Sequence, residues 1–368
     1  MHAGGAERVA ANLCNAWAAR GDTVTLVATY SGRGGNVYPL HAGVRLIYLA
    51  DKVPASRVRW LTQVRRFWAL RKLTKIAKTD VVVSFLTNVN VASIVATVGL
   101  RIPTLVAERS YPPKMPIPFN LALLRKLTYP HAARVVMLTQ LGLKWLHLAI
   151  PRAAGEAVSN PVVYPLPAGD PFCAVGKVVP ADRYLVIGVG RLSAEKQFDH
   201  LIKAFAPLAP LFPDWVLALA GSGPQEEDLK QLCRQLGVAD RVYFPGRVGN
   251  LGDWYAQADL FVLSSSFEGF PGALVEAMSY GCAVVSYDCA SGPGEIIHDG
   301  EDGLLVDPKA GIASLGDAMI TLMADDAKRE RLGKAAEAVR ERYSLPNTLA
   351  QWDRIFDAVR QPGREQHT

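Results

Sequence analysis

Two glutamates bracket a predicted helix start in the C-terminal half of the chain. Glu268 lies in a serine-rich turn that follows an apolar run, and Glu276 comes after seven intervening residues. Ionised carboxylates accept hydrogen bonds from hydroxyl groups, so the pair suits an uncharged, hydroxyl-rich group such as a ribose or another sugar. A pair that merely caps or solvates the helix is the alternative interpretation of this spacing.

The helix start between these glutamates has the features of an anion site. Pro271 suits the first helical position because its fixed φ fits there and its missing N–H would have no partner. The amides of Gly272, Ala273 and Leu274 would then point out of the helix terminus, where the helix dipole attracts phosphate. Carboxylates for hydroxyl groups beside amides for phosphate predict a sugar nucleotide as the ligand.

The surrounding sequence, SFEGFPGALVEAMSYGCAVVS, resembles the E-x7-E signature of family 4 glycosyltransferases, and the resemblance extends over most of the chain. It implies the GT-B fold, an α/β architecture with two Rossmann-like, doubly wound domains facing each other across a cleft. It also implies a retaining transferase in which Glu276 holds the donor's ribose and Glu268 positions the transferred sugar. The helix-start amides would hold the diphosphate, and Phe270 would line the donor site.

A second motif follows the apolar run of residues 184–189. Arg191 and the pair Glu195-Lys196 resemble the GRL-xxEK motif of the same family. Arg191 and Lys196 are candidate catalytic and donor-binding residues, because they can neutralise a diphosphate that leaves the sugar. A surface pair of Arg191 with Glu195 is the alternative. No Asp-x-Asp ends a strand, so we predict no metal site and no cofactor, with the nucleotide sugar as a substrate.

Two glycine-containing segments complete the predicted donor site, and a third has no assigned role. Gly246 and Arg247 follow a strand, and the resemblance places the nucleotide base there; a simple glycine turn is the alternative. Gly4 and Gly5 open a helical pattern and resemble the family's GGAER loop, so they would contact the diphosphate, unless they form a simple helix cap. The segment from Gly292 matches the family's GP-EII motif, and its role here is unassigned.

Glu108 and Arg109 follow a predicted strand of the N-terminal half, at the sheet edge where such folds bind ligands. The segment AERSYP resembles the family's SERN-P, which places the acceptor beside these two residues, with the proline-rich loop 111–119 as a lip. Other members have a histidine at this point, so the acceptor-side catalytic group is unassigned. A structural Glu–Arg pair is the alternative.

The elements that position these residues alternate between strands and helices, which favours parallel, doubly wound sheets. A chain of 368 residues suggests two domains at roughly 150 residues each. We expect an acceptor-side domain at 1–165, a linker at 166–180, a nucleotide-sugar domain at 181–345 and a C-terminal helix at 346–368 that packs back across the interface. The predicted strands are 23–29, 44–49, 80–86, 103–108, 134–138, 184–189, 215–220, 241–244, 259–263, 283–287 and 303–306.

The first domain lacks one expected strand. Domains of this type carry a central strand before their glycine loop, yet only Met1, His2 and Ala3 precede Gly4, and strands usually need about five residues. We therefore expect a further apolar strand to be encoded upstream of Met1.

Positive charge is concentrated in the N-terminal half. Residues 1–165 hold 21 Lys and Arg against 6 Asp and Glu, whereas residues 166–368 hold 19 against 28. Residues 57–78 combine apolar residues at helical spacing, two of them tryptophans, with basic residues only, which suits an anionic membrane surface. An ordinary surface helix is the alternative. No nucleic-acid-binding motif is present, so we do not expect nucleic acid as a partner.

Composition indicates the compartment. The five cysteines are an odd number without a C-x-x-C motif, which predicts neither a disulfide framework nor a zinc site and favours reducing cytoplasm. The longest apolar runs are far shorter than the roughly 18 residues that span a bilayer. We therefore expect a cytoplasmic protein that is peripheral on the inner face of the membrane.

The resemblance implies transfer of a hexose or N-acetylhexosamine from a nucleotide sugar, with a UDP-sugar favoured, to a lipid-linked or glycan hydroxyl. Cell-surface polysaccharide, lipopolysaccharide or glycoprotein glycan assembly would use such a reaction. Two alternatives remain. A sugar-nucleotide epimerase would turn over its substrate without an acceptor, and a catalytically inactive, membrane-associated protein would bind the nucleotide sugar without transferring it.

Overall fold

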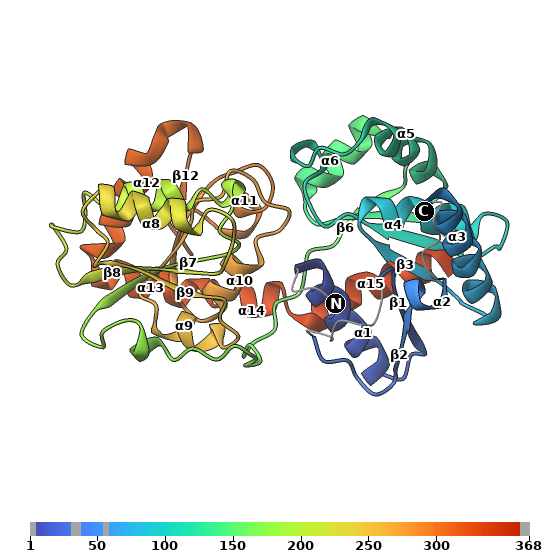
Figure 1. The fold of residues 1–368 in the computed structure, drawn as a ribbon, viewed down its shortest axis with the longest axis horizontal. Coiled ribbons are helices and arrows are strands. Elements are labelled where there is room, and N and C mark those ends of the chain that lie inside the picture. The colour runs from blue at the N-terminus through green and yellow to red at the C-terminus, as the bar shows by residue number, and fades with distance from the viewer. Residues whose placement is uncertain (1–4, 31–37, 54–58, 361–368) are drawn as a thin grey trace, which may run out of the picture. The chain divides into compact units, whose positions relative to one another are not determined.

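The computed structural model describes residues 5–30, 38–53 and 59–360. The chain divides into two compact units: unit 1 comprises residues up to Asn160 and from Thr348 on, and unit 2 comprises Pro161–Asn347. Each unit combines parallel strands with helices (Figure 1). This architecture agrees with the predicted pair of parallel α/β domains.

Unit 1 alternates strands and helices along the chain. Its strands are β1 (Val24–Ala28), β2 (Val44–Tyr48), β3 (Val82–Phe85), β4 (Thr104–Ala107), β5 (Arg134–Met137) and β6 (Gly155–Ala157). Its helices are α1 (Gly5–Ala19), α2 (Leu49–Lys52), α3 (Arg59–Ile76), α4 (Thr87–Thr97), α5 (Phe119–Thr128), α6 (Gln140–Ala149) and, from Thr348 on, α15 (Leu345–Arg360). The short 3-10 turns η1 (Pro112–Lys114) and η2 (Tyr129–His131) flank α5.

The described strands of unit 1 form two parallel sheets, β1–β2 and β3–β4–β5–β6. Strand β6 was not predicted, because its sequence Gly-Glu-Ala contains no β-branched or aromatic residue. The segment before Gly5, where a further strand is expected, lies outside the described residues.

Alternate residues of β4 face opposite sides of the four-stranded sheet. Leu105 and Ala107 pack in one cluster with Trp17 of α1 and Trp352 of α15, whose rings meet edge to face at 5.9 Å. Val106 packs in a second cluster with residues of α4 and α6. Figure 1 shows α15 running beside α1. The sheet is therefore covered on both faces, as a doubly wound fold requires.

Unit 2 has six strands in one parallel sheet. They are β7 (Tyr184–Val189), β8 (Trp215–Ala220), β9 (Val242–Gly246), β10 (Leu260–Leu263), β11 (Ala283–Tyr287) and β12 (Leu304–Val306). The helices are α7 (Phe198–Phe205), α8 (Glu226–Gln235), α9 (Leu251–Gln257), α10 (Gly272–Ser279), α11 (Pro293–Ile296), α12 (Gly311–Met323), α13 (Asp326–Ala336) and α14 (Val339–Arg342). The 3-10 turns are η3 (Val175–Lys177), η4 (Ala194–Lys196) and η5 (Pro308–Ala310).

The strand order of this sheet is β12-β11-β10-β7-β8-β9. The order reverses direction between β7 and β10, which pair in parallel. Loops leave the two sides of such a switch point in opposite directions, and this makes the carboxyl ends of the two strands a preferred ligand site. The fold therefore brings the loop after β7 beside the turn after β10.

No helix within the described residues is both long enough and apolar enough to cross a lipid bilayer.

Candidate functional site

The loop after β7 and the turn after β10 are joined by hydrogen bonds to main-chain carbonyl oxygens of the loop. The Ser266 amide donates to the Glu195 carbonyl oxygen at 2.8 Å, and the Ser264 hydroxyl donates to the Lys196 carbonyl oxygen at 2.8 Å. These bonds link two segments that are about seventy residues apart in the sequence. They fix the backbone on which both predicted charged motifs are carried.

Glu268 and Lys196 form an ion pair at this junction. The Lys196 Nζ lies 2.6 Å from Glu268 Oε1, and the Ser265 hydroxyl donates to the same oxygen at 2.6 Å. Glu268 is only 9% exposed. A carboxylate held by an ammonium and a hydroxyl has a fixed direction, which a group that positions a substrate needs.

Glu276 lies on the second turn of α10 and is 5% exposed. The Tyr255 hydroxyl donates to Glu276 Oε2 at 3.3 Å, and Tyr255 is itself fully buried. Because Tyr255 comes from α9, a second helix helps to orient this carboxylate.

Helix α10 begins one residue later than predicted. Pro271 has φ −74° and ψ 86°, so it precedes the helix and Gly272 is the first helical residue. The Leu274 amide donates to the Pro271 carbonyl oxygen at 3.0 Å. The prediction that the Leu274 amide points freely out of the helix is therefore wrong, and the amides of Gly272 and Ala273 precede the first intrahelical bond.

The segment around Gly292, to which no role was assigned, packs behind the Glu268 turn. The Glu268 amide donates to the Ala290 carbonyl oxygen at 3.2 Å, and the Ser291 hydroxyl donates to the Gly269 carbonyl oxygen at 3.3 Å. Gly292 has φ +113°, and a Cβ there would lie 2.5 Å from Cδ of Pro271. Glycine is therefore required for the close approach that supports the turn.

Arg191 is exposed at the start of the loop after β7. Burial alone would raise the pKa of Glu195, but the hydrogen bond from Ser193 at 2.6 Å and the charges of Lys196 and Arg191 hold that pKa below its ordinary value. Among the described residues, Arg191 and Glu195 do not approach within ion-pair distance. The loop thus presents cationic groups at the surface beside a carboxylate that stays ionised.

The other predicted donor-site residues are spread over both units. Gly246 ends β9 with φ +71°, and Arg247 after it is exposed. The Phe270 ring is buried against Tyr343, with ring centroids 5.2 Å apart, which gives it a packing role. Gly5 is the exposed first residue of α1 in unit 1. Gly4 lies outside the described residues.

Glu108 and Arg109 turn away from one another at the end of β4. The Glu108 carboxylate accepts hydrogen bonds from the hydroxyls of Tyr129 and Thr87 and is 2% exposed. Burial raises its pKa more than these hydrogen bonds lower it. The alternative interpretation as a structural Glu–Arg pair is therefore wrong, because Glu108 is bonded to the core of unit 1 instead.

Arg109 has donors that the described residues leave unused. Its Nη1 donates to Asn160 Oδ1 at 2.7 Å, and its guanidinium lies 4.4 Å from the ring centre of Phe85. Its Nε and Nη2 are buried without a hydrogen-bond partner within the described part of the chain. Burial lowers the pKa of Arg109 to about 9. A buried cation with unpaired donors costs free energy unless an anionic or polar group pairs with it.

The predicted basic helix is α3. Its Arg71 Nη1 donates to the carbonyl oxygens of Ala96 and Val98, each at 2.8 Å, and so caps the end of α4. Trp68 is 60% exposed, and the side chain of Trp60 lies outside the described residues. One of the basic residues thus has a structural role, and the membrane contact of this helix stays a prediction.

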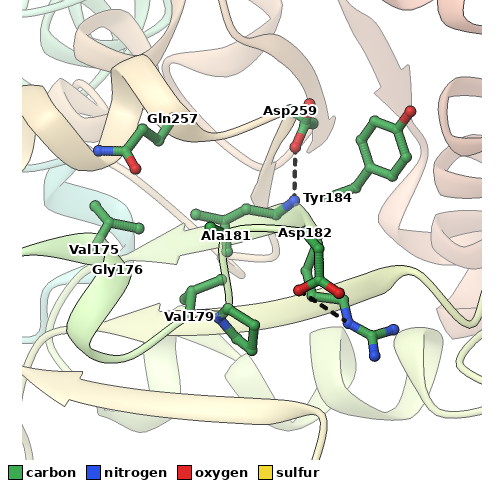
Figure 2. Close-up of a pocket in the computed structure, with 11 residues that line it drawn as sticks. Val175, Gly176, Val179, Ala181, Asp182, Tyr184, Gln257 and Asp259 are labelled. Atoms are coloured by element: carbon green, nitrogen blue, oxygen red, sulfur yellow. Dashed lines mark hydrogen bonds and ion pairs between the residues drawn. The ribbon is translucent and has the colours of Figure 1, made fainter.

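A cavity of about 470 Å³ lies elsewhere in unit 2, at the amino ends of β7 and β10. Its lining includes Tyr184, Gln257 and Asp259, as Figure 2 shows. The Asp259 carboxylate accepts a hydrogen bond from the Leu185 amide at 2.7 Å, and burial raises its pKa. Since none of the predicted site residues lines this cavity, we take the opposite ends of the strands as the candidate site.

Sequence reasoning missed two supporting residues, Ser265 and Tyr255. The serine-rich turn was visible in the sequence, but three successive serines offer no means of telling which one faces Glu268. Tyr255 belongs to a different helix from Glu276 and had no sequence signal. Across the described residues there is no group of three or more His, Cys, Asp or Glu side chains that could hold a metal ion.

Two family models match the chain, one on each unit. The model described as Glycosyl transferase 4-like domain matches residues 4–160, and that of Glycosyl transferases group 1 matches residues 176–339. An N-acetylgalactosaminyltransferase of Campylobacter jejuni, named for a diNAcBac-PP-undecaprenol-linked glycan, is 26% identical over 98% of this chain and 97% of its own length. An exopolysaccharide phosphotransferase of Streptomyces coelicolor is 35% identical over 62% of this chain, which is only 24% of that relative.

Solved structures resemble the whole chain. Anabaena Alr3699/HepE in complex with UDP has a TM-score of 0.77 at 19% identity, over 96% of each chain. A sucrose-phosphate synthase from Thermosynechococcus elongatus also has a TM-score of 0.77, at 20% identity, over 94% of this chain and 91% of its own. At such identities the likeness establishes the fold.

Proposed function

This chain is a GT-B glycosyltransferase, and from this premise we propose that it is a retaining, metal-independent enzyme that uses a UDP-sugar. The transferred group would be a hexose or N-acetylhexosamine, and the acceptor a lipid-linked or glycan hydroxyl. Relatives named for lipopolysaccharide core biosynthesis and for an undecaprenol diphosphate-linked glycan support this acceptor class. The neighbour solved with UDP supports the donor class.

The observation that carries the proposal is the ion pair of Lys196 with Glu268 at the switch point. An ammonium has three donors, so Lys196 can hold a diphosphate oxygen while it still contacts Glu268. As the bond between sugar and diphosphate breaks, negative charge gathers on the leaving group, and Lys196 and Arg191 stabilise it. Glu268, fixed by Ser265, would stabilise the positive charge that develops on the sugar.

The remaining roles follow from position. Glu276, oriented by Tyr255, would accept hydrogen bonds from the ribose hydroxyls. The amides of Gly272 and Ala273 would donate to the diphosphate at the start of α10. On the acceptor side we assign Arg109 rather than Glu108, because Arg109 has unused donors whereas the Glu108 oxygens are occupied by Tyr129 and Thr87.

The test is a screen of the purified full chain against UDP-, GDP- and ADP-sugars, with release of the nucleoside diphosphate as the readout. We expect turnover with a UDP-sugar, persistence in EDTA, and a product whose anomeric configuration by NMR equals that of the donor. Arg191→Ala and Lys196→Ala should each lower kcat more than donor affinity. An inverted product, or activity lost in EDTA and restored by Mg²⁺ or Mn²⁺, would overturn the mechanism.

A further inference from the structure

Helix α5 of unit 1 has no buried residue among its ten. Phe119, Leu123 and Leu127 are exposed by 83%, 47% and 59%, and their spacing of four residues places them along one side of the helix. Figure 1 shows α5 at the rim of unit 1, beyond the four-stranded sheet. Contiguous exposed apolar side chains of this kind mark an interaction surface.

The stretch of sequence that contains α5 carries mostly positive charge. Between Glu108 and Glu156 the sequence contains no acidic residue and seven Lys or Arg residues. Lys114, in the turn before α5, and Lys126, on α5 itself, are both exposed, and Met115 beside Lys114 is 44% exposed. Apolar side chains framed by lysines match an anionic bilayer, in which acyl chains lie beneath negatively charged headgroups.

We propose that this surface, the α5 face formed by Lys114, Met115, Phe119, Leu123, Lys126 and Leu127, docks unit 1 on an anionic lipid bilayer. The proposal deepens the proposed function by naming the surface that would bring the enzyme to a lipid-linked acceptor. The α5 face adjoins the proline-rich loop 111–119, which leads back to Arg109 at the end of β4. An acceptor that extends from the bilayer would therefore meet the docked side of unit 1.

The α5 face differs from α3, the helix that the sequence favours for the same role. In α3, Arg71 is engaged in capping α4, and Thr62 and Thr74 are buried. On α5, Leu121 packs against the core of unit 1, whereas Phe119, Leu123 and Leu127 on its other side are exposed. The Phe119 ring is 83% exposed, so it is available to a partner that removes it from water. The lysines and the lack of acidic residues favour lipid over a protein partner.

The experiment measures co-sedimentation of the full chain with phosphatidylcholine vesicles, with and without phosphatidylglycerol. We expect salt-sensitive binding to the anionic vesicles. The triple variant Phe119→Ser, Leu123→Ser, Leu127→Ser should bind the anionic vesicles at least about tenfold more weakly than the wild type. The pair Lys114→Gln, Lys126→Gln should lose much of the salt-sensitive part. Since these residues are exposed, all variants should keep the wild-type melting temperature.

Matched controls distinguish vesicle binding by the α5 face from nonspecific hydrophobic adsorption and from binding by α3. The control triple Val98→Ser, Leu148→Ser, Leu211→Ser removes three apolar residues that are at least as exposed but lie on other elements; it should bind like the wild type. A variant with Arg65→Gln, Lys72→Gln and Lys75→Gln measures how much α3 contributes to vesicle binding. Unchanged binding of the α5 triple variant, or an equal loss in the control triple, overturns the proposal.

Two further measurements test the occupant of the α5 face and its relation to the proposed function. If neither vesicle type binds and the α5 triple variant abolishes a concentration-dependent dimer in sedimentation, a second copy of the chain covers this face and the lipid proposal is wrong. Hydrolysis of the UDP-sugar without vesicles should be unchanged in the α5 triple variant. Because vesicle binding is measured without a donor, the absence of UDP-sugar turnover in the wild-type chain would contradict the proposed function and leave the docking result standing.

Discussion

Two charged residues that follow strands in different units, Glu268 in unit 2 and Arg109 in unit 1, differ in how fully they are paired. At the end of β10, Glu268 receives an ammonium and a hydroxyl, each at 2.6 Å. At the end of β4, Arg109 keeps Nε and Nη2 without partners among the described residues. Unit 2 therefore holds Glu268 in one fixed arrangement. This suits a site that binds the same donor in every turnover. Unit 1 leaves donors and apolar side chains unused, as an acceptor and a membrane would require.

The largest expected effect tests the fixed arrangement in unit 2. Glu268→Gln removes the negative charge that would stabilise the developing positive sugar, so kcat should fall by about 10²- to 10³-fold with a small change in donor KM. Steady-state kinetics with varied donor would measure this. Glu226→Gln is the matched control, because Glu226 pairs with Lys230 at 2.8 Å on an exposed helix, and it should leave kcat unchanged. A Glu268→Gln enzyme with wild-type kcat contradicts the assignment.

The next effect concerns affinity instead of turnover. Glu276→Ala should weaken donor binding by about 1–3 kcal/mol through lost hydrogen bonds to the ribose, with a smaller effect on kcat. Tyr255→Phe keeps the carboxylate and removes the 3.3 Å hydrogen bond to it, so it should show the same pattern at about 1 kcal/mol or less. Calorimetric titration with the donor measures the affinity of each variant. Equal donor affinity in all three proteins would exclude Glu276 from the donor site.

Ser265→Ala tests how much the orientation of Glu268 contributes. The variant removes one hydrogen bond and keeps the ion pair with Lys196, so kcat should fall by about 3- to 10-fold, which corresponds to about 1 kcal/mol. Ser265→Thr keeps a hydroxyl and should recover part of the loss. Ser279→Ala is a control, because that buried serine bonds to the backbone of α10 instead. Loss of activity in Ser279→Ala and none in Ser265→Ala would reverse the interpretation.

In unit 1, Arg109→Met should separate stability from function. The lowered pKa of Arg109, about 9, reflects the free energy lost on burying an incompletely paired cation. Its replacement by an apolar side chain should raise the Tm of unit 1 by a few degrees, at about 2–4 °C for each kcal/mol in a domain of this size class. The acceptor KM should rise in the same variant. A fall in Tm would mean that Arg109 is satisfied in the folded protein.

The smallest effect is a pH dependence at Glu108. Burial raises its pKa above the ordinary 4.5, so the folded protein binds this proton more tightly than the unfolded chain. The contribution of Glu108 to the free energy of unfolding is therefore lost as pH rises from about 4.5 through the raised pKa. Above that pKa, this contribution no longer changes with pH. Glu108→Gln lacks this loss, so its Tm relative to wild type should increase with pH over that range. Glu156→Gln, at a more exposed carboxylate, is the control, and a pH-independent difference for Glu108→Gln contradicts the argument.

The sequence by itself determined the strands and the motifs that follow them. Residues 184–189, 215–220 and 283–287 were predicted to the residue, because parallel strands buried on both faces read as continuous apolar runs between turn residues. The glutamates 268 and 276 and the charged residues after β7 were also visible, since each motif is contiguous in the chain. Strand β6 was not, because its three residues have no strand preference.

Only the tertiary structure decided which of these groups meet. Lys196 and Glu268 are 72 positions apart and pair because β7 and β10 are neighbours in the sheet, an order that no local pattern encodes. Glu108 and Arg109 are adjacent in sequence, yet one bonds to Tyr129 and the other to Asn160, because successive residues at a strand end point to opposite sides. Hydrogen-bond partners and unused donors depend on what lies across the sheet or helix, and that is fixed only when the whole domain packs.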